Sequence, residues 1–149
     1  MDSFFNQVRA TVTQARERAR RAEGLPPDDL RRQYEIFEAR IERLFRIATA
    51  ASDGFFEYSK LSDGHYSAHL HRLAVRRTQW SNVALFFRVD TSDLKAWTQV
   101  HEASNREHAR GGWFNVPLLL IPDYDAYIKG KILDLTHWID VSEPSASKF

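Results

Sequence analysis

Three histidines lie close together near the middle of the chain, at positions of equal parity: His65, His69 and His71. Successive residues of a β-strand point to opposite faces of the sheet, so these three imidazoles would share one face. A His-x-His pair on a strand can place two ring nitrogens on one metal ion, with a further ligand from a neighbouring strand. The spacing therefore offers a metal site of the kind that metal-dependent hydrolases use.

The neighbouring sequence does not complete such a site. Asp63 and Gly64 favour a two-residue hairpin turn, which sets the cross-strand partners of the histidines. The expected pairs are Ser62 with His65, Tyr58 with His69 and Phe56 with His71. The partner strand then supplies aromatic rings and no carboxylate, and residues 72–78 contain no Asp or Glu. We therefore expect histidines that pack beside aromatic rings and no cofactor, with the metal site kept as an alternative.

A polar segment at residues 104–112 is a second candidate, because it joins two arginines and a histidine to a diglycine. Arginine beside a glycine-rich backbone can hold a phosphate or carboxylate group. The segment lacks the Gly-Lys-Ser/Thr ending of a phosphate-binding loop, and a solvated connection would have the same composition. We take Arg106, His108 and Arg110 as candidate binding residues.

A third candidate is a row of arginines on one face of the first expected helix: Arg9, Arg16 and Arg20. Such a row can contact phosphates or an acidic protein surface. Residues 1–50 contain ten Arg against eight Asp plus Glu, so the local excess of positive charge is small. No zinc finger or other nucleic-acid recognition module accompanies it. An acidic protein is therefore the expected partner, and nucleic acid is the alternative.

The composition excludes several kinds of chemistry. The chain has no cysteine, which rules out disulfides, zinc-thiolate sites and a cysteine nucleophile. It contains no nucleophile elbow and no His-Glu-x-x-His motif. The formal net charge is only +1, so the molecule as a whole has no strong field for nucleic acid or an anionic membrane. These absences favour a non-catalytic protein that binds another protein, as an inhibitor, adaptor or immunity-type partner, or as a homodimer.

Two helices are expected to come first in the chain. Apolar residues in the first recur at spacings of 3, 4, 3, 4 and 3, which is a heptad seam: Phe5, Val8, Val12, Ala15, Ala19 and Ala22. A second seam follows a Gly/Pro turn: Leu30, Tyr34, Phe37, Ile41, Leu44, Ala48 and Ala51. An antiparallel hairpin of the two would place large side chains against small ones at each level.

The remainder of the chain favours an antiparallel sheet. Short β-rich runs occupy residues 55–61, 66–75, 83–89 and 113–120. A short helix is expected within 94–103, a helical turn within 122–129 that stops at Gly130, and a closing strand within 131–141. The fold class is therefore α+β, with an N-terminal antiparallel helical hairpin packed on a mainly antiparallel β-sheet with short inserted helices.

The length of 149 residues is that of one domain. We expect a single domain over 1–141, made of the hairpin at 1–52 and a sheet-rich part at 54–141, followed by a disordered tail at 142–149. No apolar run is long enough to span a membrane, and the first residues lack the basic and apolar regions of a signal peptide. The expected location is the cytoplasm, with no membrane partner.

Overall fold

The computed structural model describes residues 2–62, 68–76, 81–104, 109–110 and 112–139. Two N-terminal helices precede an antiparallel sheet and a C-terminal helix, which confirms the α+β class. The helices are α1 (Ser3–Glu23), α2 (Pro27–Ala51) and α3 (Tyr124–Leu135), with 3-10 turns η1 (Leu118–Leu120) and η2 (Thr136–Trp138). The strands are β1 (Phe56–Ser62), β2 (Ala68–Val75), β3 (Ser81–Asp90), β4 (Lys95–Ser104), β5 (Ala109–Arg110) and β6 (Phe114–Asn115).

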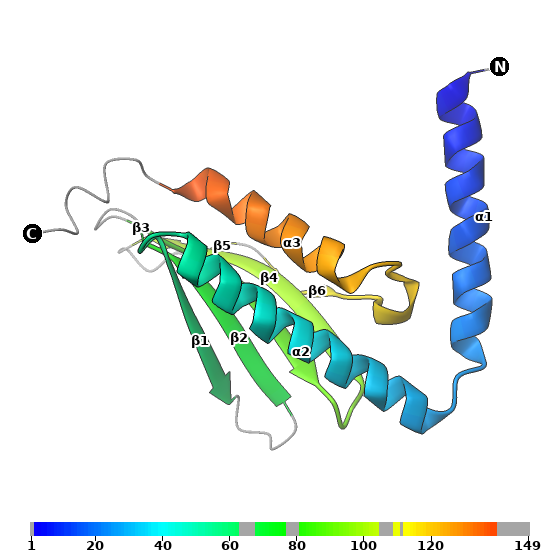
Figure 1. Ribbon diagram of the computed structural model, residues 1–149, viewed down its shortest axis with the longest axis horizontal. Helices are drawn as coiled ribbons and strands as arrows, with labels where there is room; N and C mark the ends of the chain where they lie inside the picture. The colour runs from blue at the N-terminus through cyan, green and yellow to red at the C-terminus, as the bar shows by residue number, and fades with distance from the viewer. Residues whose placement is uncertain (1, 63–67, 77–80, 105–108, 111, 140–149) are drawn as a thin grey trace, which may run out of the picture.

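The sheet is antiparallel, in the order β1-β2-β3-β4-β5, with β6 also paired to β4. Helices α2 and α3 lie against the same face of this sheet and against each other (Figure 1). Residues of one parity on each strand point toward these helices and form the core. Leu73 pairs with Leu85 across β2 and β3, and both are fully buried. The residues of opposite parity form the outer face, over which the described part of the chain places no helix.

Helix α2 follows from its sequence. Pro27 occupies the first turn, where its missing N–H costs nothing, and Asp28 and Asp29 face the positive end of the helix dipole. The apolar stripe then supplies the buried residues of the helix: Phe37, Ile41, Leu44 and Phe45. The second expected seam is therefore real, and it packs on the sheet and α3.

The two successive helices and the short turn between them are as predicted, but their side chains do not interlock. The helices diverge from the turn, and α1 stands away from the sheet (Figure 1). Helix α1 has no buried residue, and its main contact is with η1. Phe5, Val8 and Val12 are 46%, 44% and 43% exposed. The predicted packing of large on small between the helices is wrong because α2 turns its apolar stripe to the larger apolar surface of the sheet.

Three local predictions need correction. The helix expected within 94–103 is strand β4, because pairing with β3 along its whole length overrides a weak helical pattern. The run at 113–120 forms only the short strand β6 before Pro117 and η1. The strand expected within 131–141 is the end of α3 followed by η2. The predicted tail at 142–149 lies outside the described residues.

The last of these errors has a clear cause. Leu133 and Leu135 alternate with polar residues, which resembles a half-buried strand. In the structure, Ile128, Ile132 and Leu135 form one buried helical face, and Leu133 is 63% exposed. The helix continues through Gly130, since packing of this face outweighs the cost of about 1 kcal/mol that glycine adds. None of the described helices combines the length and apolarity needed to cross a membrane.

Candidate functional site

Two of the three predicted histidines meet a carboxylate that comes from α2. His71 Nε2 lies 2.8 Å and His69 Nδ1 lies 2.9 Å from the same oxygen, Oε2 of Glu38. An ionised carboxylate can only accept hydrogen bonds, so both of these ring nitrogens carry a proton and donate it. His71 is fully buried, whereas the His69 side chain is 34% exposed. Glu38 therefore joins two strand residues to the helix that covers them.

A tyrosine extends this hydrogen-bonded chain. The hydroxyl of Tyr58 lies 2.8 Å from Nδ1 of His71. The two ring nitrogens of His71 therefore link the phenol of Tyr58 to the carboxylate of Glu38. Burial, followed by the negative charge of Glu42, raises the pKa of Tyr58 to about 12, against the opposing effect of Arg46. The phenol therefore stays protonated at neutral pH.

The carboxylate of Glu38 is held in its charged form. Burial by itself would raise its pKa, but the hydrogen bond and charge of His71, together with those of His69, outweigh burial. The pKa of Glu38 consequently lies below its ordinary value of 4.5. Oε2 accepts from both rings at once, which is the arrangement expected of a structural anchor.

The strand register differs from the predicted one. Ser62 pairs with His69 and Lys60 with His71, so the register is shifted by four residues from the predicted one. The pairs predicted at the start, including that of Ser62 with His65, are wrong. The apolar inner residues set this register, because Phe56 opposes Val75 and both are buried. His65 lies outside the described residues.

Sequence reasoning missed Glu38, because it sought a carboxylate on the neighbouring strand. The signal was its position next to Phe37 and three residues before Ile41, at the margin of the apolar stripe of α2. Within the described residues, no group of three or more His, Cys, Asp or Glu is placed to hold a metal ion. In this structure the nitrogens of His69 and His71 that face Glu38 are hydrogen-bonded to it.

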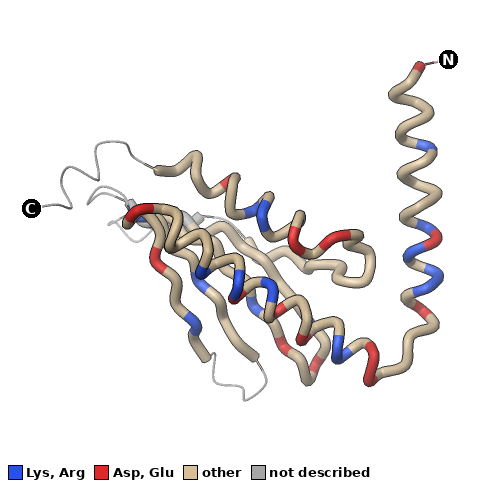
Figure 2. The backbone as a smooth tube through the Cα atoms, in the orientation of Figure 1, with Lys and Arg blue, Asp and Glu red and all other residues tan. Residues whose placement is uncertain are grey.

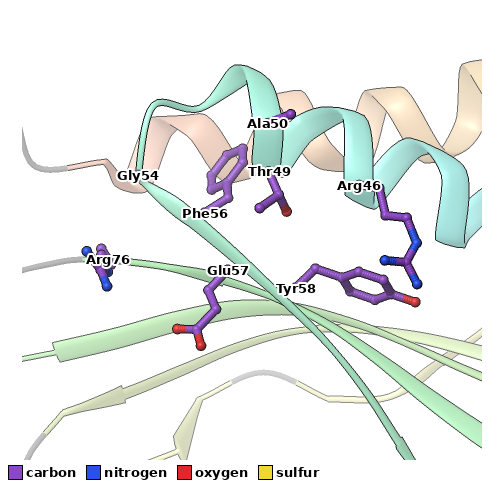
Figure 3. A pocket seen from close by; sticks show the side chains of 8 residues that line it. All are labelled: Arg46, Thr49, Ala50, Gly54, Phe56, Glu57, Tyr58 and Arg76. Carbon is purple, nitrogen blue, oxygen red and sulfur yellow. The ribbon is translucent and has the colours of Figure 1, made fainter.

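An open cavity of about 640 Å³ lies beside Tyr58, between the end of α2 and β1 (Figure 3). Its lining is Arg46, Thr49, Ala50, Gly54, Phe56, Glu57, Tyr58 and Arg76. The guanidinium of Arg46 lies over the Tyr58 ring, 5.3 Å from its centre. Thr49 and Ala50 belong to the last turn of α2, whose negative dipole end disfavours an anion there. The hydroxyl of Tyr58 is already engaged by His71, so the cavity offers no free nucleophile among the described residues.

Comparisons with protein-family models, curated proteins and solved structures find no match.

The arginines predicted to bind a partner fall in separate places. Arg9, Arg16 and Arg20 lie on α1, whose basic residues gather mainly in its C-terminal half (Figure 2). All three are exposed, and none forms an ion pair with a residue that the structure describes. Arg110 lies in β5, whose backbone pairs with β4 at the far edge of the sheet. The other two predicted binding residues, Arg106 and His108, lie outside the described residues.

Proposed function

We propose that this chain is a non-catalytic protein that acts by binding another protein through α1. The observation that carries the proposal is the exposure of this helix, which is 21 residues long and buries none of them. Four of its large apolar side chains are open to solvent: Phe4 (67%), Phe5 (46%), Val8 (44%) and Val12 (43%). An exposed apolar stripe of this kind is typical of a protein interface.

The charge beside the stripe indicates the chemistry of the partner. Arg9 and Arg16 flank the apolar seam on one side, and Arg20 lies farther round the helix. Arginine is enriched among the residues that dominate binding energy at interfaces, and complementary charge speeds association. The partner is therefore expected to present acidic residues to this part of α1. An inhibitor, adaptor or immunity-type role is compatible with such a contact.

Charge reversal on α1 tests the proposal. The triple variant Arg9→Glu/Arg16→Glu/Arg20→Glu is expected to capture the partner from native lysate at least about tenfold less well than the wild type. The matched control Arg31→Glu/Arg32→Glu/Lys129→Glu changes the same net charge at exposed positions on α2 and α3 and should capture normally. Mass spectrometry identifies the captured protein, and surface plasmon resonance then measures the association rate. Equal capture by both triple variants would contradict the proposal.

Single-stranded nucleic acid is a second candidate partner, which the outer face of the sheet favours. Arg72 pairs across the strands with Phe86, so a cation lies beside an aromatic ring on this face. The ring of Trp113 lies 6.2 Å from that of Phe86 and is 43% exposed. Stacking of a base on such a ring contributes about 1 to 3 kcal/mol, and arginine attracts the phosphates.

Fluorescence anisotropy with a labelled single-stranded oligonucleotide tests this second candidate. Binding that falls steeply with salt and that Arg72→Ala and Trp113→Ala both weaken is the expected result. The control Arg16→Ala/Arg20→Ala should bind as the wild type does. If only the α1 variant loses binding to the oligonucleotide, the nucleic-acid site would lie on α1 and the outer face would be excluded.

A further inference from the structure

We infer that the apolar seam of α1 is covered by α1 of a second copy of this chain, in a two-fold symmetric antiparallel pair. The inference rests on the proposed role of α1 as a binding element and names the occupant of its seam. In proteins most of the stability of a helix comes from packing of its apolar face, and the described part of the chain buries no residue of α1. The contacts that hold it helical must therefore come largely from a partner.

The spacing of the seam is self-complementary. Its intervals of 3, 4, 3, 4 and 3 read the same from either end, so two antiparallel copies bring their apolar layers into coincidence. A two-fold pair also requires that if one residue contacts another, the reverse contact occurs too. The layers that satisfy both conditions are Phe5 with Ala22, Val8 with Ala19 and Val12 with Ala15, each formed twice.

Side-chain size selects the antiparallel direction. The N-terminal half of the seam carries only large residues, and the C-terminal half carries only alanines. An antiparallel pair therefore joins one large and one small side chain in every layer, which keeps the helices evenly spaced. A parallel pair would place Phe5 against Phe5 and Ala22 against Ala22, so the helices would be forced apart at one end and leave voids at the other.

The surroundings of the seam leave room for this pair. The N-terminal half of α1 extends away from the sheet (Figure 1). Ala15 is exposed, and Ala19 and Ala22 are partly exposed. Phe4 lies at the margin of the outermost layer and would be covered together with it. The pair thus accounts for all four large apolar side chains that α1 exposes.

The charged residues beside the seam both favour and oppose this arrangement. Helical side chains lean toward the N-terminus of their own helix, so Arg9 leans toward Glu23 of the second copy and Glu23 leans toward Arg9. Arg16 faces Arg16 of the second copy near the two-fold axis, which opposes association. Arg20 points away from the seam and stays on the outside of the pair, available to the acidic partner proposed above.

Disulfide crosslinking tests the direction and register, because the wild-type chain contains no cysteine. Chains carrying Val8→Cys, mixed with chains carrying Ala19→Cys and oxidised gently, are expected to crosslink into a mixed dimer. Each variant alone should crosslink poorly. Efficient crosslinking of Val8→Cys chains with each other would overturn the antiparallel pair.

Analytical ultracentrifugation over a range of concentrations tests association itself. The wild type is expected to sediment as a dimer, and Val8→Glu should weaken self-association at least about tenfold. Arg16→Gln should tighten it, whereas the same variant should bind an acidic partner more weakly. Arg20→Glu should leave the dimer intact while it weakens capture of the partner.

The two proposals fail separately in these experiments. A wild-type chain that stays monomeric, yet loses its partner when Arg9, Arg16 and Arg20 are reversed, would overturn the self-pairing and leave the proposed function standing. A dimer with the crosslinks expected here, but with equal capture by the two triple variants, would support the self-pairing and contradict the acidic partner.

Discussion

Replacing Glu38 with alanine is expected to lower the free energy of unfolding by about 2 to 4 kcal/mol at neutral pH. The variant removes the shared acceptor of two hydrogen bonds, at 2.8 and 2.9 Å, and leaves the fully buried His71 with an unsatisfied ring N–H. The loss also frees α2 from β2 at the point where helix and strand are joined. Urea denaturation followed by circular dichroism measures the difference.

A matched control lies four residues farther along the same helix. Glu42 bonds to Lys60 at 2.6 Å, and these side chains are 30% and 40% exposed. An exposed pair of this kind contributes at most about 1 kcal/mol, so Glu42→Ala should cost much less than Glu38→Ala. Equal losses in the two variants would show that Glu38 is no more than a surface partner of the histidines.

The effect of Glu38 should depend on pH in a defined direction. Its pKa in the folded chain lies below the ordinary value of 4.5, so the folded state binds the proton more weakly than the unfolded state does. The stabilisation is therefore complete above the ordinary carboxyl range and is lost as the pH falls through the lowered pKa. The difference between wild type and Glu38→Ala should narrow only at acidic pH. A difference that stays constant down to the lowest pH tested would contradict the assigned pKa shift.

Phe87→Ala is expected to cost about 3 to 5 kcal/mol, because it opens a cavity at the centre of the core. Phe87 is fully buried, and its ring centre lies 5.8 Å from that of Phe37 and 6.0 Å from that of Phe45. These contacts join β3 to α2, so the gap cannot close without movement of the helix. Thermal and chemical denaturation both measure the loss.

The adjacent residue provides the control for this second variant. Phe86 points to the outer face, where it is only partly buried, and Phe86→Ala should cost about 1 kcal/mol. If the outer face binds single-stranded nucleic acid, Phe86→Ala should also lower the affinity of the protein for it. A larger loss of stability at Phe86 than at Phe87 would mean that the two faces of β3 have been assigned the wrong way round.

Local periodicity predicted the elements that bury a continuous stripe. The seam of α2 and the inward residues of β1, β2 and β3 follow the periods of helix and strand, so their assignment required no tertiary information. The order of elements then indicated the α+β class. Prediction failed where two periods fitted equally well, as in β4 and at the end of α3, because pairing with a neighbour or packing of a face decides such segments.

The sequence predicted the two histidines of the candidate site but not Glu38. Parity placed His69 and His71 on one face, and both do point toward Glu38. Their partner is distant in the chain, and its contribution depends on the angle at which α2 crosses the sheet. The spacing of residues within one helix or strand does not predict that crossing angle. The same limit applies to α1. Its apolar seam was predicted to pack on α2, because the sequence does not show how much apolar surface the sheet offers to α2.

The isolation of α1 from the core separates two kinds of evolutionary constraint. A substitution on its seam or its arginine row changes recognition, and the fold of the sheet and its covering helices is left intact because α1 contributes no buried side chain to it. Residues of α2 have no such freedom, since the same helix supplies both core and anchor. New binding preferences can therefore accumulate in the first helix without a change to any side chain of the core.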